Sequence, residues 1–340
     1  MDLDGDGIKD IVSGSWPGEI FLFRGKPDGS YGPPEKLRDK EGHIINVGGA
    51  IREDADSITI TGDAEFKEDK DGHYVEFNGK IYRNTPQKQV LVTGCASSVA
   101  VADWNGDGLL DLIVGDIRGH VHVYLNEGTR QRYAFGKPIQ LKANGKPIEA
   151  PHGDAGPCVA DWDGDGLLDL IVGCGDGSVI FYRNSGTARE PKLDEGQVLI
   201  AAGAIEYDSE KIPKTPTRGV RAKVCVVDYN GDGLPDLLVG DLSNQKPHKP
   251  EPTAEQKKKQ AEARKEMEKL QGEYGQLVQK MIGPNRVKDK DGAKKVSEQL
   301  TKLRERLMAA QKESGAEYET HGWLWLFLRE PAAKKTAAVR

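Results

Sequence analysis

Residues 161–173 read DWDGDGLLDLIVG, and this thirteen-residue pattern occurs four times in the chain. The other copies are DLDGDGIKDIVSG at 2–14, DWNGDGLLDLIVG at 103–115 and DYNGDGLPDLLVG at 228–240. In each copy an acidic, glycine-rich loop leads into a short apolar stretch typical of a buried strand. After the first three copies, a turn at a glycine opens a second alternating run, such as HVHVYL after Gly119. Four copies in one register predict a repeat protein.

The repeats predict an all-β fold. Units of about 60 residues with three or four short strands are typical of the blades of a β-propeller, of which at least four are visible. The fourth unit lacks a third strand of its own, and the run HGWLWLFLR at 321–329 is predicted to supply it. Trp323, Trp325 and Phe327 alternate with leucines, so we expect this strand to be buried on both faces.

A segment of different composition separates the fourth unit from its last strand. Residues 243–320 are rich in Lys, Glu, Gln and Ala, and their apolar residues recur at steps of three and four. These residues are Met267, Leu270, Tyr274, Leu277 and Met281, then Val296, Leu300, Leu303, Leu307 and Ala310. We therefore predict an α-helical hairpin, with its turn near Gly283-Pro284, inserted in the last blade. The predicted domains are a propeller at 1–242 plus 321–330, the coiled-coil-like insertion at 243–320, and a disordered tail at 331–340.

The beginning of the chain leaves two questions open. The stretch 46–94 makes the first unit longer than the others, either as an insertion, which we favour, or as a degenerate blade. Met1 leads directly into the first acidic loop, without the basic and apolar stretches of a secretory signal. The protein is therefore either cytoplasmic or truncated at its N-terminus. The first blade is completed by the C-terminal strand, or the chain is a fragment of a larger ring.

The acidic loops carry the donor set of a Ca²⁺ site. Oxygen ligands stand at positions one, three, five and nine, with a glycine at position six and a backbone carbonyl at position seven. The predicted ligands are Asp2, Asp4, Asp6, the Ile8 carbonyl and Asp10; Asp103, Asn105, Asp107, the Leu109 carbonyl and Asp111; Asp161, Asp163, Asp165, the Leu167 carbonyl and Asp169; and Asp228, Asn230, Asp232, the Leu234 carbonyl and Asp236. Clustered carboxylates repel one another unless a divalent ion lies among them, and oxygen-only ligation favours Ca²⁺. The sequence thus predicts up to four Ca²⁺ sites.

Two other interpretations of the loops are weaker. An EF-hand needs a glutamate at position twelve and flanking helices, but Ser13, Val114, Val172 and Val239 occupy that position and apolar strands flank the loops. A single Asp-Gly cluster is commonly an ordinary turn, which fits four nine-residue matches poorly.

The pattern D-x-[DN]-G-D-G-x-x-D followed by an apolar strand resembles the FG-GAP, or VCBS, repeat family. The resemblance covers roughly residues 1–242 and 321–330. It implies an integrin-α-like β-propeller with Ca²⁺ in a strand-to-strand loop, and an exported protein. We therefore expect an extracellular or cell-surface location and favour a truncated N-terminus. The family includes adhesion modules, bacterial surface proteins and accessory domains of carbohydrate-active enzymes, so it does not define one function.

Composition and motifs exclude several classes. The net charge of -6 argues against a nucleic-acid partner, and no apolar run is long enough for a membrane span. No metalloprotease, hydrolase or nucleotide-binding motif is present. His120 and His122 share a strand face and are read as polar surface rather than as metal ligands. The sequence His152-Gly-Asp154 is read as a turn rather than an acid/base pair. We predict no enzyme activity.

Two further sets of residues recur at equivalent positions. Trp104, Trp162 and Tyr229 follow the first Asp of their loops, which predicts packing between blades; ligand stacking is less favoured. The four cysteines are too few for a disulfide framework and are predicted to be buried free thiols. They are Cys95, Cys158, Cys174 and Cys225.

These observations predict a calcium-binding extracellular β-propeller that acts as a binding or adhesion scaffold for an unidentified protein or glycan. In this hypothesis Ca²⁺ is mainly structural. Two alternatives remain: a propeller-bearing carbohydrate lyase or hydrolase, and an assembly module that uses the helical insertion as a coiled coil. The sequence assigns no oligomeric state.

Overall fold

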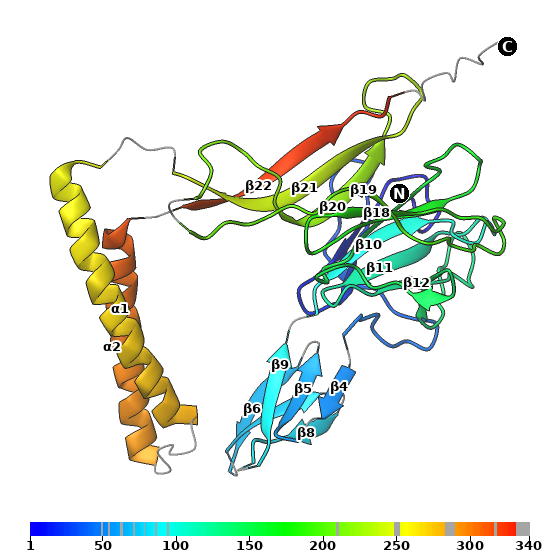
Figure 1. Cartoon of the computed structure of the whole chain (residues 1–340). Helices are drawn as coiled ribbons and strands as arrows, with labels where there is room; N and C mark the ends of the chain where they lie inside the picture. Colours follow the sequence, from blue (N-terminus) through cyan, green and yellow to red (C-terminus); the bar gives the residue numbers. More distant parts are fainter. Residues whose placement is uncertain are drawn as a thin grey trace. The chain divides into compact units, whose positions relative to one another are not determined.

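The structure is a computed structural model that describes residues 1–48, 50–53, 55–61, 64–70, 72–77, 79–85, 87–93, 95–208, 211–247, 252–282, 290–315 and 318–330. The described residues are mostly β, with two helices (Figure 1). They form two compact units, one of Met1–Ile205, Thr217–Ser243 and Gly322–Arg340, the other of Glu206–Pro216 and Asn244–His321. The predicted tail at 331–340 and the predicted turn at Gly283-Pro284 lie outside the described residues.

Four antiparallel sheets follow the four sequence repeats. The first contains β1 (Ile11–Gly14), β2 (Ile20–Phe23) and β3 (Glu35–Lys36). The second contains β10 (Ser97–Ala102), β11 (Asp111–Asp116), β12 (Val121–Tyr124) and β13 (Ile139–Gln140). The third contains β16 (Gly156–Ala160), β17 (Asp169–Gly173), β18 (Val179–Tyr182) and β19 (Gln197–Ile200). The fourth contains β20 (Val220–Val227), β21 (Asp236–Gln245) and β22 (Glu319–Phe327). A short hairpin of β14 (Lys142–Ala143) and β15 (Lys146–Pro147) precedes the third sheet.

Each sheet is a meander in which consecutive strands are neighbours. The register repeats from sheet to sheet: Ile113 pairs with Val123 in the second, and Ile171 pairs with Phe181 in the third. β22 pairs with β21. The prediction that the fourth unit takes its third strand from the C-terminal part of the chain is therefore confirmed. Completion of the first sheet by this strand, one of the two options left open, is wrong.

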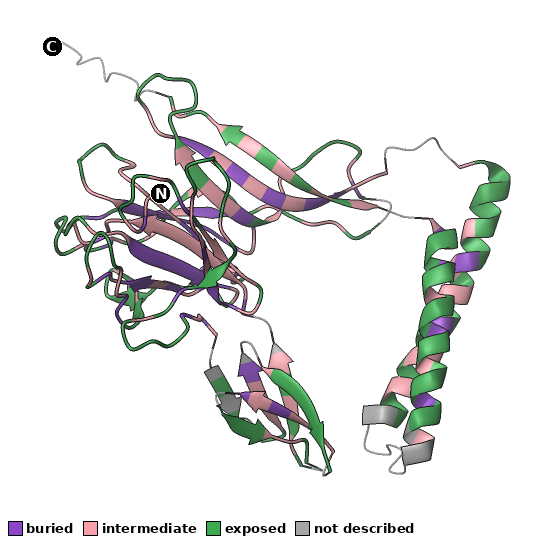
Figure 2. Cartoon of the chain, turned by 180° about the vertical axis from the view of Figure 1, so that it is seen from behind, coloured by how far each residue is buried: buried purple, intermediate pink, exposed green. Residues whose placement is uncertain are grey.

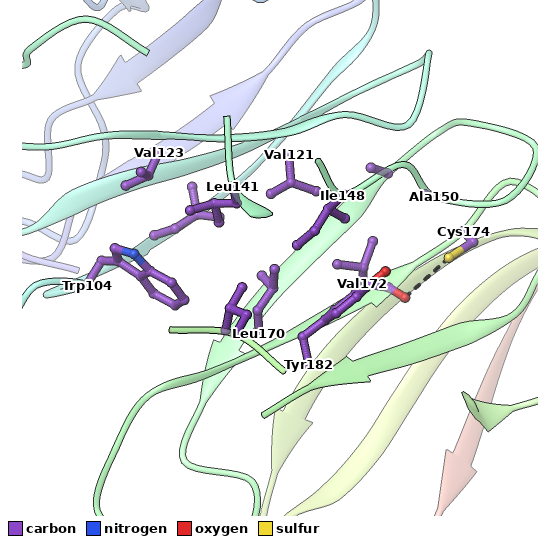
Figure 3. Packing of buried hydrophobic residues seen from close by; sticks show 13 residues of the cluster. Trp104, Val121, Val123, Leu141, Ile148, Ala150, Leu170, Val172, Cys174 and Tyr182 are labelled. Atoms are coloured by element: carbon purple, nitrogen blue, oxygen red, sulfur yellow. Dashed lines mark hydrogen bonds between the residues drawn. The ribbon is translucent and has the colours of Figure 1, made fainter. Parts of the chain in front are cut away.

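Consecutive sheets pack face to face through three apolar clusters. We call the face turned to the following sheet the leading face and the opposite one the trailing face. Val121 on the leading face of the second sheet lies in one buried cluster with Leu170 and Val172 on the trailing face of the third (Figure 3). Ile20 and Leu112 occupy equivalent places in the cluster between the first two sheets. Figure 2 shows buried residues gathered in the central strands of these sheets.

The two terminal sheets each carry one uncovered face. On the leading face of the fourth sheet Leu324 is 70% exposed, Leu326 40% and Leu328 52%. The prediction that β22 is buried on both faces is therefore wrong, because no further sheet covers this face in the described part of the chain. Ile11, on the trailing face of the first sheet, is 43% exposed, whereas Leu112 at the equivalent position is fully buried.

The stretch between the first two sheets forms sheets of its own. β4 (Ala50–Glu53), β5 (Ser57–Thr61) and β9 (Gln89–Thr93) make one, and β6 (Glu65–Asp69), β7 (Gly72–Phe77) and β8 (Lys80–Tyr82) make the other. β5 and β9 run parallel, unlike any neighbours in the four meanders. Ile60, Val75 and Phe77 form a separate small core. This topology is that of an insertion, not of a degenerate blade.

The second unit contains α1 (Ala254–Ile282) and α2 (Lys290–Ser314). A capping box begins α1, because Thr253 and Gln256 exchange side-chain to backbone hydrogen bonds. Gly315, with φ 73°, ends α2 in the left-handed conformation. Leu270, Leu303 and Ala310 of the two predicted seams pack together between the helices. Among the described residues, neither helix is both long and apolar enough to cross a membrane.

Candidate metal centre

The acidic loops occupy one structural position. In the second, third and fourth sheets they connect the first and second strands, and the first loop leads directly into β1. The glycines at positions four and six of every loop have φ between 66° and 89°, which is the region that side chains disfavour. They are Gly5, Gly7, Gly106, Gly108, Gly164, Gly166, Gly231 and Gly233. The tight turn therefore requires glycine at both positions.

Peptide N–H groups hold the carboxylates at positions one and five. The position-one carboxylate accepts a hydrogen bond from the glycine N–H at position six, as in Gly108 to Asp103 at 2.9 Å and Gly166 to Asp161 at 2.9 Å. The position-five carboxylate accepts one from the N–H at position seven, as in Leu109 to Asp107 at 2.8 Å. The first and fourth loops repeat these bonds. The loops are thus organised by their own backbone.

The aspartate at position nine has a different place from the others. Asp111, Asp169 and Asp236 are fully buried, and Asp10 is 5% exposed. In each, one carboxylate oxygen accepts from the N–H at position two. The other accepts from a residue just past β2 in the first sheet and just past the third strand in the other three. In the fourth sheet these donors are Tyr229 at 3.0 Å and Arg329 at 2.8 Å. This side chain therefore fastens the loop to the end of a later strand.

Burial makes the charge at position nine costly. Burial raises the pKa of Asp111 to about 6, although the N–H groups of Asn126 and Trp104 act in the opposite direction. Burial also raises the pKa of Asp169. A carboxylate in this setting is stabilised in its ionised form by a nearby cation.

Free oxygen atoms at the loops fit a hard cation. Asp103 Oδ1 is buried and has no hydrogen-bond partner among the described residues, although Oδ2 of the same carboxylate is bonded. Ligand oxygens of Asp2, Asp4 and Asp6 lie within 4.8 Å of one another, as do those of Asp161, Asp163 and Asp169. The second and fourth loops have Asn105 and Asn230 at position three. The donors are all oxygen, which suits Ca²⁺. The roles of the individual ligands, including the four backbone carbonyls, stay predictions.

Two kinds of residue at these loops escaped the sequence analysis. Asn126 and Asn184 are 2% and 1% exposed, and each donates its N–H to the position-nine aspartate. The side-chain oxygen of each also accepts two backbone N–H groups. Their equal distance from the start of the second and third repeats was the available signal. Arg24 directly follows β2 and Arg183 directly follows β18, and both bind loop carboxylates.

A third cluster of possible ligands lies outside the repeats. Asp39, Glu41 and His43 have donor atoms within 4.8 Å of one another. Asp39 Oδ1 accepts the N–H groups of Glu41 and His43, both at 2.9 Å, and Lys137 lies 3.7 Å from Glu41. These bonds explain the cluster as a hairpin turn.

The other candidate residues have structural roles. Asp154 accepts hydrogen bonds from Arg221 Nε at 2.6 Å and Lys223 Nζ at 3.0 Å. Burial alone raises the pKa of Asp154, but the two cations outweigh it and hold the pKa below its ordinary range. His120 Nδ1 lies 3.2 Å from the buried carboxylate of Asp116. Burial lowers the pKa of His122.

The exposure of the aromatic residues at position two depends on whether a neighbouring sheet covers them. Trp104 is 5% exposed in the cluster between the second and third sheets, and Trp162 packs between the third and fourth. Tyr229, on the fourth sheet, is 62% exposed because the leading face there is uncovered. The packing prediction is confirmed for the two tryptophans and wrong for Tyr229.

The cysteines are all free. Cys95 and Cys174 are buried, as predicted, and burial raises the pKa of each thiol to about 11. Cys158 is half-buried and Cys225 is exposed, so the prediction is wrong for these two. Cys225 is exposed because it lies in β20 at the open end of the sheet stack, beyond the last inter-sheet cluster.

The fold and loops define a protein built from β-sheet repeats with acidic strand-to-strand loops. The FG-GAP-like repeat family matches residues 103–172 and 161–239. The repeats and the integrin alpha relatives together support an FG-GAP, integrin-alpha-like family.

Several curated proteins resemble the chain over part of their length. Mouse integrin alpha-3 is 27% identical over 254 residues, which is 68% of this chain and 23% of that protein. Human integrin alpha-7 is 32% identical over 169 residues, 45% of this chain and 13% of that protein. Chicken integrin alpha-6 is 33% identical over 170 residues, 44% of this chain and 14% of that protein. The chain thus spans less than a quarter of the length of these relatives.

Among solved structures, the periplasmic gluconolactonase PpgL of Pseudomonas aeruginosa aligns over 70% of this chain and 64% of its own. The sequence identity is 17% and the TM-score 0.28, which is too low to bear on fold or function.

Proposed function

We propose that this chain is a Ca²⁺-stabilised β-propeller module that binds a protein or glycan outside the cell. The observation that carries the proposal is the loop geometry: four equivalent loops cluster carboxylates, and Asp103 Oδ1 is buried without a partner in the described part of the chain. The integrin alpha relatives support an adhesion-type role at the cell surface.

In this proposal Ca²⁺ supplies the positive charge that lets the clustered carboxylates stay ionised. Oxygens at positions one, three and five, with the position-seven carbonyl, hold the ion. The position-nine aspartate contributes charge while it fastens the loop to a later strand. The loops thereby link successive strands within each sheet. The proposed domains are the propeller at 1–242 plus 321–330 and the insertion at 243–320.

A binding role agrees better with the candidate residues than a catalytic one. Asp154, considered with His152 as an acid/base pair, is held by ion pairs with Arg221 and Lys223. His120, considered as a metal ligand, lies beside the carboxylate of Asp116. A carboxylate whose pKa is lowered by two cations is a poor general acid near neutral pH.

The proposal is tested by calorimetric titration of the full chain with Ca²⁺ after chelator treatment. We expect up to four ions per chain. Asp103→Ala removes the unpartnered oxygen and is expected to remove one ion. Asp28→Ala is the matched control, because Asp28 forms an ordinary turn with Ser30 outside the loops. No binding by the wild type, or equal stoichiometry in both variants, would contradict the proposal.

A further inference from the structure

The four loops differ at one position beyond their nine residues. In each repeat, a residue just past a later strand donates its backbone N–H to the position-nine aspartate. The residue directly before this donor is Arg24 in the first repeat and Arg183 in the third. The equivalent residues in the second and fourth repeats are Leu125 and Leu328. Arg24, Leu125 and Arg183 each stand twenty-two residues after the first aspartate of their loop. All four residues directly precede the N–H donor to the position-nine aspartate. The repeats therefore fall into an arginine class and a leucine class.

Each arginine binds the oxygens that its loop leaves free. In the third loop Arg183 Nε lies 2.6 Å from Asp163 Oδ2, and its Nη2 donates to Asp165 Oδ2 at 2.9 Å. The Oδ1 atoms of the same two aspartates accept backbone N–H groups instead.

The first loop repeats this division of oxygens. Arg24 binds Asp4 Oδ2, while Asp4 Oδ1 accepts the N–H of Asp6. In both loops the guanidinium therefore holds oxygens that a metal ion needs.

The two classes also differ in charge. The first and third loops have four aspartates, because position three is Asp4 or Asp163. The second and fourth loops have three, because position three is Asn105 or Asn230. The arginine occurs only where the extra carboxylate occurs. The aspartates and the arginine of each loop then sum to -3, and Lys9 makes the first loop -2.

We propose that Arg24 and Arg183 are built-in counter-ions that occupy the cation sites of the first and third loops until Ca²⁺ displaces them. This inference rests on the proposed Ca²⁺ function. In the leucine-class loops, among the described residues, Asp107 Oδ2 and Asp232 Oδ2 accept only the neutral side-chain amides of Asn105 and Asn230, so these loops bind the ion first. The arginine-class loops bind it more weakly, because the guanidinium must leave its loop carboxylates. These are Asp163 and Asp165 for Arg183, and Asp4 for Arg24, whose Nε also binds Glu35 outside the loop. The Arg183 side chain is 46% exposed, so it can move into water when the ion enters.

The test compares Ca²⁺ titrations of the wild type and of the double variant Arg24→Leu and Arg183→Leu. Leucine is the residue that the second and fourth repeats carry at this position. We expect two affinity classes in the wild type and binding about three- to fivefold tighter at the weaker sites of the variant, the size of an ion pair at a partly exposed site. Arg130→Leu is the control, because Arg130 lies beside the second loop and donates to the Gly108 carbonyl. It measures the effect of removing a nearby charge, which we expect to be less than twofold.

The melting temperature supplies a second readout, in which the order of the double variant and the wild type is expected to reverse between chelator and Ca²⁺. In excess chelator the double variant is expected to melt below the wild type, because the extra carboxylates lose their counter-ion. In saturating Ca²⁺ it is expected to melt at or above the wild type. Arg183→Lys, which keeps the charge and loses the planar fork, is expected to lie between the two.

Two results separate this inference from the proposed function. Ca²⁺ binding with unchanged affinities in the double variant, or weaker binding, would overturn the counter-ion inference alone. It would place the arginines outside the occupied site. No Ca²⁺ binding by either protein would overturn the proposed function and this inference with it.

Discussion

The carboxylate at position nine of the fourth loop ties together parts of the chain that are far apart. Asp236 accepts N–H bonds from Tyr229 at 3.0 Å and from Arg329 at 2.8 Å, and the latter joins residues 93 positions apart. Asp236→Asn keeps one acceptor oxygen, but its NH₂ group then faces a peptide N–H. One charge-assisted hydrogen bond is lost and one buried N–H is left unpaired, which costs about 2–4 kcal/mol.

The assay is urea unfolding of the full chain in excess chelator, so that cation binding does not contribute. Trp323 and Trp325 lie on β22, which the Asp236–Arg329 bond fastens, and tryptophan fluorescence reports on this strand. Asp232→Asn is the matched control, because Asp232 is exposed and carries the same charge in the same loop. We expect it to change the free energy of unfolding by less than about 1 kcal/mol. Equal destabilisation by the two variants, or none by Asp236→Asn, would refute the assignment of position nine as the structural clamp.

Three further predictions concern packing and charge elsewhere. Trp104→Ala is expected to lower the free energy of unfolding by about 3–5 kcal/mol, and Tyr229→Ala by less than about 1 kcal/mol, because only Trp104 is covered by a neighbouring sheet. Urea unfolding of both variants measures this difference. Similar losses in the two variants would contradict it. The pKa of Asp154 lies below its ordinary 3.8, so its ion pairs stabilise the fold above about pH 4 and lose this contribution as the pH falls through the lowered value. The difference in free energy of unfolding between the wild type and Asp154→Asn should therefore narrow on acidification. A constant difference would be evidence against the ion pairs. Leu270→Ala is expected to destabilise the helical unit by about 2–4 kcal/mol, because Leu270 is buried between the helices, whereas Met308→Ala is expected to leave it nearly unchanged, because Met308 is exposed. Hydrogen exchange of the helix amides measures the difference. Equal protection in both variants would show that the seam does not hold the helices together.

Local features of the chain were predictable because they repeat. The continuous apolar DLIVG runs and the glycine positions of the loops depend only on neighbouring residues, and the four meanders follow them. The end faces were not predictable in the same way. Leu324 and Trp323 both belong to an apolar strand, but whether each is covered depends on a neighbouring sheet and not on the strand itself. The absence of a covering sheet in the described part of the chain also explains why Tyr229 and Cys225 are exposed.

At the candidate site, too, local features were predictable and contacts with distant residues were not. The aspartates of the loops were visible as a pattern, whereas their separate roles were not. Asp111 and Asp107 look equivalent as ligands in the sequence, yet only the structure shows that Asp111 is fully buried and bonded through both oxygens. Arg183 reaches its loop from the far end of the third strand, and no local spacing rule connects the two.

Thermal unfolding of the full chain, followed by circular dichroism in millimolar Ca²⁺ and then in excess chelator, tests the central claim most directly. An ion that binds only the folded state at 100 times its dissociation constant adds about 2.7 kcal/mol per site. The account therefore predicts a β-rich spectrum and a melting temperature that falls sharply on chelation and returns when Ca²⁺ is restored. A melting temperature that is the same in both conditions would make the four loops ordinary acidic turns and contradict the proposal of a Ca²⁺-stabilised module.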